Sequence, residues 1–422
     1  MIKKSLRDRS LDYHSFPTPG KIEISIKKKC ESKDDLSLAY TPGVAAPCLE
    51  IEKNPLASYS YTNRGNLVGV ISNGTAVLGL GNIGASASKP VMEGKSVLFK
   101  KFAGVDAFDI EINEKDLDRF VLIVSSLEPT FGGINLEDIK GPDCFYIEEK
   151  LIEKMKIPVF HDDQHGTSVI ATAGLLNASE LLQKDISSMK IVASGAGAAA
   201  LPTLNMFVKA GADISKIDVF DRDGHLNLKR KDTNKYNRRF SQKKSPITIS
   251  EAIEGADLFL GLSAKGVLTE KIIKKMAKNP IIFALANPDP EIDFKAARRA
   301  RKDAVICTGR SDYPNQINNV LGFPFIFRGV LDCRASRVTE NMKFAAAMSL
   351  ALLARKRVPE YVKKLYREDL KFSKEYIIPK PFDRRVFIDE SLAVLKQAHA
   401  DGVNGKSVDF KEYERRLKGM IR

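Results

Sequence analysis

Two pairs of adjacent carboxylates are the side chains of this sequence best suited to chemistry. Glu137 and Asp138 follow a Gly-Gly loop, and Asp162 and Asp163 follow a short apolar run at residues 157–160. Together they can supply three oxygen ligands to a hard divalent cation, because Mg²⁺ and Mn²⁺ prefer carboxylate oxygens and leave other positions to water or substrate. On spacing alone an ordinary alternative stays open, since acidic pairs are common in loops and an aspartate before a helix is often its N-cap.

The elements that must position the second pair are a strand and a helix. The apolar run 157–160 has the character of a short strand, and residues 167–182 have the character of a long helix. The carboxyl end of a strand, just before a helix, is where α/β proteins commonly place functional groups. We therefore expect Asp162 and Asp163 in a functional turn between these two elements.

From Lys190 onwards, apolar strands alternate with helices, which is the pattern of a parallel α/β sheet. A strand at 191–194 runs into a G-x-G-x-x-A turn and a helix, and the next strand, 217–220, ends in Asp221. Such glycines let the backbone approach a pyrophosphate at the helix N-terminus, and the acid accepts hydrogen bonds from the adenosine ribose. The combination predicts a dinucleotide site formed by Gly195, Ala196, Gly197, Ala198, Ala199 and Asp221.

The choice between NAD and NADP stays open in this turn. Asp221 repels a 2′-phosphate and so favours NAD, whereas Arg222 beside it can accept the phosphate of NADP. The balance of these two residues tilts slightly towards NAD.

Other elements are expected around these sites. Residues 66–81 read as a hairpin around Asn73-Gly74, which is a strong hairpin signal. In the first half we also expect strands at 22–26 and 107–112 and helices at 96–102 and 116–127. In the second half we expect strands within 256–263, 280–288 and 304–308, an exposed loop at 229–244 and helices from residue 339 to the C-terminus.

Composition narrows the class of protein. At 422 residues and 43% hydrophobic content, two globular domains are the default expectation. No apolar run approaches the roughly 20 residues of a membrane span, and no apolar segment follows the charged start as a secretory signal requires. The five cysteines are scattered and form no C-x-x-C pair, which indicates a reducing compartment and a cytoplasmic protein.

The net charge of +14 raises nucleic acid as a partner. The basic runs at 27–29 and 229–231, however, lack the interleaved aromatic residues of a single-strand binder. We interpret the charge as a basic solvated surface that also attracts anionic substrates, and we expect neither nucleic acid nor membrane as a partner.

Several ordered motifs closely resemble those of the malic enzymes, specifically the short bacterial type, over nearly the whole chain. The matching runs are AYTPGVA at 39–45, GTAVLGLGNIG at 74–84, PVMEGK at 90–95, LEDI at 136–139, HDDQHGT at 161–167, ANP at 286–288 and NN at 318–319. The resemblance implies an α/β fold with an N-terminal malate and metal domain (residues 1–162), a Rossmann-type doubly wound parallel-sheet domain for NAD(P) (163–395) and a C-terminal helical tail (396–422). It also implies a homodimer or higher homo-oligomer.

The implied reaction is oxidative decarboxylation of (S)-malate to pyruvate and CO₂ with NAD(P)⁺ and Mg²⁺ or Mn²⁺; decarboxylation of oxaloacetate is a further expected activity. By resemblance Glu137, Asp138 and Asp163 are metal ligands, Lys95 is the general base, Tyr40 is the general acid, Asn287 and Asn319 hold malate, and Asn287 also borders the cofactor. Asp162 is a further catalytic candidate that orients Lys95 or a bound water. Without the resemblance, the local sequence around Tyr40 indicates only a tyrosine in a loop.

The chemistry explains why such a set is needed. Hydride leaves C2 of malate only if the C2 hydroxyl loses its proton, so Lys95 must be neutral, and both burial and a nearby cation lower a lysine pKa. One departure from the family pattern is Ala76, which stands where larger members carry an arginine that grips malate. The residue that binds the C1 carboxylate is therefore open.

Two alternatives remain. Another nicotinamide-dependent dehydrogenase on a similar two-domain frame would need no metal and would release no CO₂. A basic nucleic-acid-binding protein with a degenerate Rossmann domain is favoured only by the net charge, and in it Lys95 and Asp163 would be dispensable.

Overall fold

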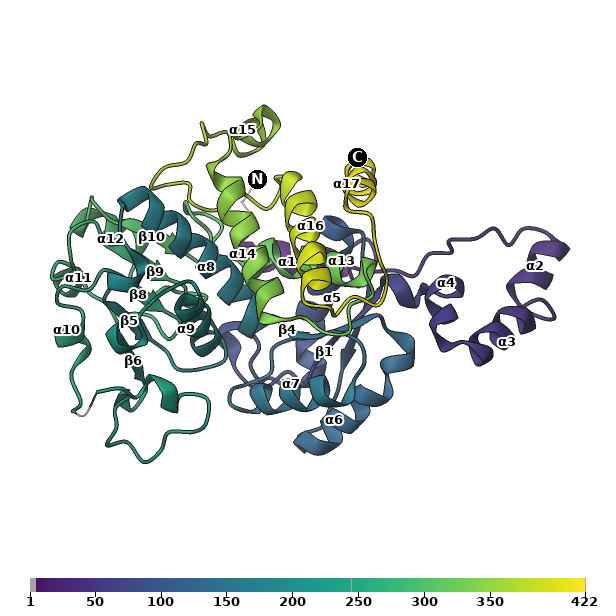
Figure 1. The fold of residues 1–422 in the computed structure, drawn as a ribbon, viewed down its shortest axis with the longest axis horizontal. Coiled ribbons are helices and arrows are strands. Elements are labelled where there is room, and N and C mark those ends of the chain that lie inside the picture. The colour runs from purple at the N-terminus through teal and green to yellow at the C-terminus, as the bar shows by residue number, and fades with distance from the viewer. Residues whose placement is uncertain (1–4, 244, 422) are drawn as a thin grey trace.

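The computed structural model describes residues 5–243 and 245–421, and it has the predicted α/β architecture with two separate sheets (Figure 1). The first sheet has the order β2-β1-β3-β4, with all neighbouring strands parallel. Its strands are β1 (Leu67–Ser72), β2 (Asp106–Glu111), β3 (Gly133–Leu136) and β4 (Val159–His161). Both β1 and β3 are buried along their whole length, which is typical of a parallel sheet covered on both faces.

Helices from distant parts of the chain cover this first sheet. They are α5 (Ala85–Ala103), α6 (Leu117–Ser126), α7 (Asp143–Lys154) and, from far along the sequence, α13 (Phe323–Asp332). The ring of Phe99 on α5 lies 4.8 Å from that of Phe323 and 5.2 Å from that of Phe327 on α13, measured between centroids. The chain therefore returns to the first sheet after completing the second.

The second sheet has the order β10-β9-β8-β5-β6-β7, in which only β6 and β7 are antiparallel. Its strands are β5 (Ile191–Ser194), β6 (Ile217–Asp221), β7 (Gly224–His225), β8 (Leu258–Gly261), β9 (Ile281–Ala284) and β10 (Val305–Thr308). The strand order reverses at β5, which lies between β6 and β8. Such a switch point is where doubly wound sheets bind their ligands.

Alternating side chains of the second sheet point into two different cores. Val192, Phe259, Ile282 and Ile306 belong to a smaller apolar cluster on one face. Their neighbours along the strands join the main core, which continues into the first sheet. The helices of this half are α9 (Ala200–Lys209), α10 (Ile249–Ala252), α11 (Glu270–Ile273) and α12 (Phe294–Ala300).

A long helix, α8 (Asp162–Leu182), connects the two sheets (Figure 1). It packs against α9 on one side and against α14 on the other. The C-terminal helices are α14 (Glu340–Arg355), α15 (Glu360–Tyr366), α16 (Arg385–Ala400) and α17 (Phe410–Met420). The prediction of helices from residue 339 is thus confirmed for the described part of the chain.

The N-terminal helices are α1 (Leu6–Ser15), α2 (Lys33–Ala39), α3 (Ala45–Lys53) and α4 (Ser58–Tyr61). Helices α2 and α3 project away from both sheets at the right of Figure 1. The strand expected at 22–26 is wrong: this segment is irregular, and Ile24 and Ile26 are exposed. An alternating pattern makes a strand only where a sheet edge accepts it.

The hairpin expected at 66–81 is also wrong. The run 67–72 is β1, but β2 and β3 occupy both of its edges in parallel, so no edge is left for an antiparallel return. Instead the chain forms a short 3₁₀ turn at Leu78–Leu80 and then enters α5, which begins well before the expected residue 96. Within the described residues, no helix combines the length and apolar character needed to cross a membrane.

Candidate active site

The acidic pair Asp162 and Asp163 forms the first turn of α8, since β4 ends at His161 and the helix begins at the next residue. The sequence placed both aspartates in a turn before a helix starting at residue 167, so the helix begins earlier than expected. Negative side chains are favoured in a first turn because they face the positive end of the helix dipole. Gly166 is required here, because a Cβ on it would lie 2.1 Å from Asp162 Oδ1.

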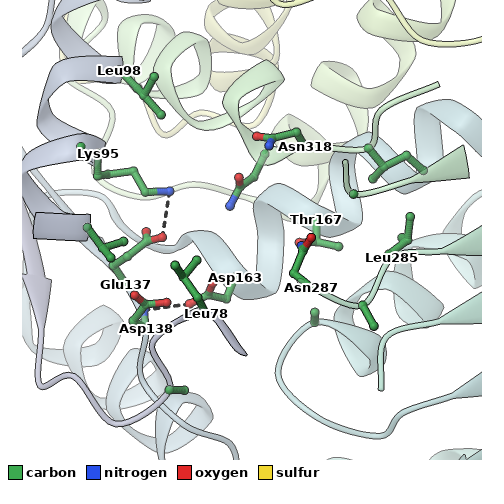
Figure 2. A pocket seen from close by; sticks show the side chains of 18 of the residues that line it. Leu78, Lys95, Leu98, Glu137, Asp138, Asp163, Thr167, Leu285, Asn287 and Asn318 are labelled. Carbon is green, nitrogen blue, oxygen red and sulfur yellow. Dashed lines mark hydrogen bonds and ion pairs between the residues drawn. The ribbon is translucent and has the colours of Figure 1, made fainter. Parts of the chain in front are cut away.

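Three carboxylates meet at the carboxyl ends of β3 and β4 (Figure 2). One oxygen each from Glu137, Asp138 and Asp163 lie within 4.8 Å of one another. The backbone N–H of Asp138 donates to Asp163 Oδ2 at 2.9 Å, which fixes the two loops together. The buried Oδ2 of Asp138 has no hydrogen-bond partner among the described residues.

The electrostatics of this cluster favour a cation. Burial, together with the charges of Asp163 and Glu137, raises the pKa of Asp138 to about 9. Burial also raises the pKa of Glu137 and of Asp163. Three close oxygen donors, one of them unsatisfied, fit a single divalent cation such as Mg²⁺ or Mn²⁺.

Lys95 reaches this cluster from α5 (Figure 2). Its Nζ lies 2.9 Å from Glu137 Oε1, contacts Asp162 Oδ2, and lies 4.0 Å from the centroid of the Phe323 ring. Asp162 Oδ2 also accepts a hydrogen bond from Asn319 Nδ2. Asp162 therefore links the lysine to the loop that carries Asn319.

The protonation state of Lys95 is set by two opposing effects. Burial lowers its pKa, as expected from the sequence, but the charges of Asp162 and Glu137 outweigh burial and raise the pKa above the ordinary lysine value. The expectation of a lowered pKa thus does not hold for the chain's own groups alone. A neutral Lys95 requires that at least one of these carboxylates be neutralised.

A pocket of about 720 Å³ brings these groups together with the second sheet. Lys95, Glu137, Asp138 and Asp163 line one side, and Asn287, Asn318, Asn319 and Ala199 line the other (Figure 2). Asn287 follows β9, and Ala199 belongs to the G-x-G-x-x-A turn. Predicted residues more than a hundred positions apart thus share one cavity.

The predicted residues that do not line this pocket are Asp162, Gly195, Ala196, Gly197, Ala198, Asp221 and Tyr40. Asp162 is buried next to it in contact with Lys95, whereas Tyr40 lies on the N-terminal segment. Tyr40 caps the C-terminus of the projecting helix α2, and it is 70% exposed. Conversely, Tyr13 and Lys21 line the pocket although no sequence signal marked them. Both lie in a polar, basic segment without a recognisable motif, so only the fold reveals them.

The glycine-rich turn after β5 has the shape of a dinucleotide cradle. Gly195 has φ +117° and lies so close to β8 that a Cβ would sit 2.4 Å from the carbonyl oxygen of Leu262. A Cβ on Gly197 would meet no atom within 4 Å, so the backbone there faces open space. The residues present therefore fit a pyrophosphate approaching the N-terminus of α9.

Asp221 ends β6 as predicted, but its carboxylate is already paired. Arg230 donates to both of its oxygens, at 2.7 and 2.9 Å, and also binds Asp232. Only 12% of the Arg230 side chain is exposed. The part of the candidate cofactor site that would face the adenosine ribose thus carries the guanidinium of Arg230 as well as the carboxylate of Asp221.

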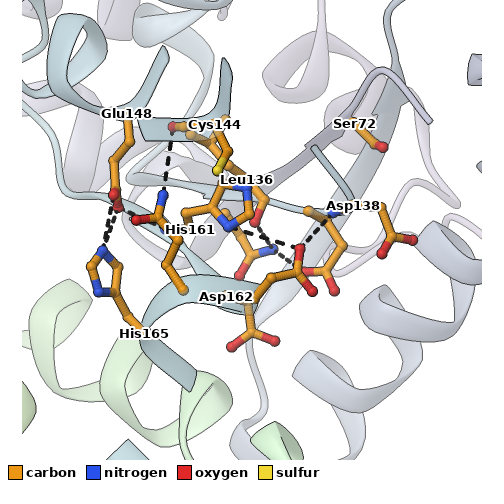
Figure 3. Close-up of polar contacts among 12 residues, drawn as sticks. Ser72, Leu136, Asp138, Cys144, Glu148, His161, Asp162 and His165 are labelled. Atoms are coloured by element: carbon orange, nitrogen blue, oxygen red, sulfur yellow. Dashed lines mark hydrogen bonds and ion pairs between the residues drawn. The ribbon is translucent and has the colours of Figure 1, made fainter. Parts of the chain in front are cut away.

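A buried polar network holds the start of α8 in place (Figure 3). Glu148 on α7 accepts from the backbone N–H of His161 at 2.9 Å and contacts His165 Nε2 at 2.8 Å. Lys343 on α14 lies 3.0 Å from His165 Nδ1. Burial alone would raise the pKa of Glu148, but His165 and Lys343 lower it to about 2, so the network keeps a fixed negative charge behind the site.

The fold and the pocket define a two-part α/β protein of the dinucleotide-binding class, in which an acidic cluster shares a cleft with the glycine-rich turn. Two family models match: "Malic enzyme, N-terminal domain" over residues 19–152 and "Malic enzyme, NAD binding domain" over residues 164–367. The NADP-dependent malic enzyme of Halomonas elongata is 50% identical, over 94% of either chain. The chain belongs to the malic enzyme family.

Other relatives differ in length. The NADP-dependent malic enzyme of Salmonella typhimurium is 55% identical over 100% of this chain but only 56% of its own length, so this chain spans about half of that relative. The crystal structure of the malic enzyme from Pyrococcus horikoshii superimposes with a TM-score of 0.89 at 43% identity, covering 99% of this chain and 96% of that one. The predicted fold class is thereby confirmed.

Proposed function

We propose that this protein catalyses metal-dependent oxidative decarboxylation of (S)-malate to pyruvate and CO₂, with NAD(P)⁺ as oxidant. The observation that carries the proposal is a single pocket in which Lys95 contacts two carboxylates and which also includes Ala199 of the dinucleotide turn. Family membership supports it. We also propose a cytoplasmic homodimer, as expected from the cysteine pattern and the resemblance, and decarboxylation of supplied oxaloacetate as a partial reaction.

Glu137, Asp138 and Asp163 would hold a divalent cation, which would supply polarisation of the C2 oxygen during loss of CO₂, and a nicotinamide in the adjoining dinucleotide site would supply the hydride acceptor. Lys95 removes the proton of the C2 hydroxyl. With the Glu137 charge offset by a cation, one of the two charges that raise the Lys95 pKa would be cancelled, which would lower that pKa towards the neutral amine. Asp162 orients the Nζ, because its Oδ2 accepts from Lys95 and Asn319 together.

The proposed groups that hold malate are two asparagine side chains and one lysine ammonium group. Asn287 and Asn319 present side-chain amides to the pocket and are the proposed donors to its carboxylates. Lys21 lines the same pocket as Ala76, and its Nζ rests 2.5 Å from the carbonyl oxygen of Pro90 on α5. We assign to Lys21 the binding of the C1 carboxylate of malate, because Ala76 has no charged side chain that could bind it.

Replacing Lys21 tests that assignment. In Lys21→Met we expect the KM for malate to rise about 10- to 100-fold with a small change in kcat, because a charge-assisted hydrogen bond is worth about 1.5–3 kcal/mol. Steady-state kinetics with malate varied at saturating cofactor measures this. Lys115→Met, at an exposed lysine outside the pocket, is the matched control. Equal KM values in the two variants would remove Lys21 from the malate site.

The position of Arg230 favours NADP as the cofactor. This reverses the slight preference for NAD that we drew from Asp221 in the sequence. The guanidinium offsets the charge that would repel a 2′-phosphate, and it presents a planar fork suited to phosphate. Relatives of similar identity carry either name: the protein from Salmonella typhimurium is NADP-dependent and one from Rhizobium meliloti, 53% identical, is NAD-dependent. The names alone therefore do not decide the cofactor.

In Arg230→Leu we expect the ratio of kcat/KM for NADP⁺ to that for NAD⁺ to fall about 10- to 100-fold, since the phosphate loses its partner and Asp221 is left unpaired. Arg222→Leu is the comparison, because Arg222 is the other cation beside Asp221. A ratio that falls only in Arg222→Leu would transfer the role to that residue.

The function itself is tested by following cofactor reduction with malate and Mn²⁺ in the purified protein. We expect turnover with malate that stops on addition of a chelator. Absence of turnover with either cofactor would contradict the proposed function.

A further inference from the structure

A second pocket, of about 310 Å³, lies where the last turn of α5 meets the start of α16 and the end of α17. Phe325 of α13 completes it, and α13 packs against both α5 and α16 (Figure 1). Helix α5 also carries Lys95, yet no described residue lines both this pocket and the candidate active site. The volume is at the lower end of the range for pockets that bind small molecules.

Phenylalanine rings form the walls of this pocket. The ring of Phe102 lies 6.5 Å from that of Phe325 and 5.3 Å from that of Phe382, measured between centroids. Phe325 in turn lies 6.3 Å from Phe387. Phe325 and Phe387 are buried, whereas Phe382 is 49% exposed and Met420 is 45% exposed. Packed rings that are open to solvent at one edge favour a ligand with an apolar part, because its binding removes apolar surface from water.

Three cations lie at the edge of these rings: Lys100, Lys101 and Arg384. Lys100 is already paired with Asp106 at 2.6 Å. Lys101 and Arg384 are exposed, and neither forms an ion pair with another described residue. Two positive charges are therefore left for a ligand.

Asp383 is the one carboxylate among the described residues that line the pocket, and it does not offset these charges. It is 1% exposed, and its Oδ2 lies 2.6 Å from the guanidinium of Arg385. Its Oδ1 also accepts from the backbone N–H of Arg385. Helix α16 begins at Arg385, so the positive end of its dipole adds to the attraction for an anion.

These features select one kind of ligand. The lining offers no polar side chain besides the three cations and Asp383, so a sugar or a nucleotide would leave most of its polar groups without partners. A cationic ligand would be repelled. An unbranched alkyl chain fits between the rings and the flexible side chain of Met420, and a carboxylate at its end matches Lys101 and the planar fork of Arg384.

We propose that this pocket binds a medium-length alkyl monocarboxylate, with its chain against the phenylalanine rings and its carboxylate between Lys101 and Arg384. The site is separate from the malate reaction proposed above, because none of its lining residues belongs to the candidate active site.

Calorimetric titration of the full chain with decanoate, below its micelle concentration, tests the proposal. We expect one decanoate per chain, and octanoate should bind about 15-fold more weakly because it buries two fewer CH₂ groups. Acetate, which lacks the chain, and decyltrimethylammonium, which reverses the charge, should not bind. Absence of decanoate binding, or equal binding of decyltrimethylammonium, would overturn the proposal.

The double variant Lys101→Glu/Arg384→Glu locates the carboxylate. We expect its affinity for decanoate to fall about 10- to 100-fold, because both charge-assisted hydrogen bonds are lost. Lys278→Glu/Lys302→Glu makes the same change of charge at two exposed lysines outside the pocket, and its affinity should match the wild type. A variant at Lys101 and Arg384 that binds as the wild type does would place decanoate elsewhere.

Phe382→Ser locates the alkyl chain. We expect about tenfold weaker binding of decanoate, because the chain loses an apolar wall. The matched control is Phe108→Ser, at a phenylalanine on β2 that is 40% exposed and lies outside the pocket. Equal affinities in these two variants would contradict the proposed position of the chain.

Other occupants of these surfaces are separate outcomes of the test. Saturating malate should leave the affinity for decanoate unchanged, and displacement would place decanoate in the candidate active site instead. Retention of the protein on phosphatidylglycerol vesicles without decanoate binding would indicate a membrane contact. A change in sedimentation of Lys101→Glu/Arg384→Glu without decanoate binding would indicate a contact with a second copy. Each of these three results would overturn the proposal.

Discussion

Lys95→Ala is expected to lower kcat/KM for malate by about 10²- to 10⁴-fold, the usual range for loss of a general base. The Nζ that contacts Glu137 and Asp162, which is the proposed acceptor of the C2 proton, disappears. Cofactor affinity, measured by calorimetry, should stay unchanged, because the turn at Gly195 lies on the other sheet. Loss of turnover with cofactor binding intact is therefore the expected pattern.

The matched control is Lys89→Ala on the same helix. Lys89 is half-exposed and pairs with Asp109 at 2.5 Å, outside the pocket, so turnover should change little. Since Lys95→Ala leaves two buried carboxylates without their counter-charge, Lys95→Gln is a second variant that keeps the length of the side chain. Near-wild-type turnover in both Lys95 variants would rule out this lysine as the base.

Asp163→Asn is expected to weaken Mn²⁺ binding more than the roughly 10- to 100-fold that changes around metal ligands typically cost. The reason is that one of three close oxygen donors loses its charge. Calorimetric titration of the metal alone measures the affinity without relying on turnover.

A measurement of thermal stability distinguishes the loss of a metal ligand in Asp163→Asn from general damage to the fold. Asp163 raises the pKa of Asp138, so the substitution removes a repulsion, and the metal-free Tm should be unchanged or higher. The rise in Tm that Mn²⁺ gives the wild type should shrink in the variant, since a ligand stabilises only the state that binds it. The control is Glu153→Gln at an exposed glutamate, where both readings should match the wild type. Unchanged Mn²⁺ affinity in Asp163→Asn would refute the assignment of Asp163 as a ligand.

The features predicted correctly from the sequence are those that local pattern determines. The second sheet followed from apolar runs of strand length separated by helices, and Asp221 was placed at the end of β6 because the strand pattern stops there. The carboxylate pairs were recognised because the first follows a Gly-Gly loop and the second follows a short apolar run. Their convergence on one point follows from the parallel order of β3 and β4, which places the carboxyl ends of both strands at the same edge.

The errors arise where distant parts of the chain decide the outcome. Asn73-Gly74 is a hairpin signal, yet the edges of β1 are filled by strands that occur later in the sequence. Helix α5 was expected only from residue 96, and the part that the structure adds contains Pro90, a residue type that disfavours a helix interior. In the structure the helix includes Pro90, and packing against β1, β2 and α13 offsets the lost hydrogen bond.

The position of Tyr40 relative to the site was beyond local pattern for a related reason. The motif that carries Tyr40 predicts a role and not a place, and its helix, α2, projects away from both sheets and buries no residue. Lys21 was missed because its proposed role depends on its contact with Pro90 of α5, which no local sequence pattern indicates.

The most direct test of the central claim is the stoichiometry of products formed from (S)-malate and NADP⁺ with Mn²⁺. Pyruvate, CO₂ and reduced cofactor should appear in equal amounts, and all three should disappear when the metal is chelated. Oxaloacetate accumulating without CO₂, at a rate that chelation leaves unchanged, would contradict this account and would instead support a dehydrogenase that does not decarboxylate.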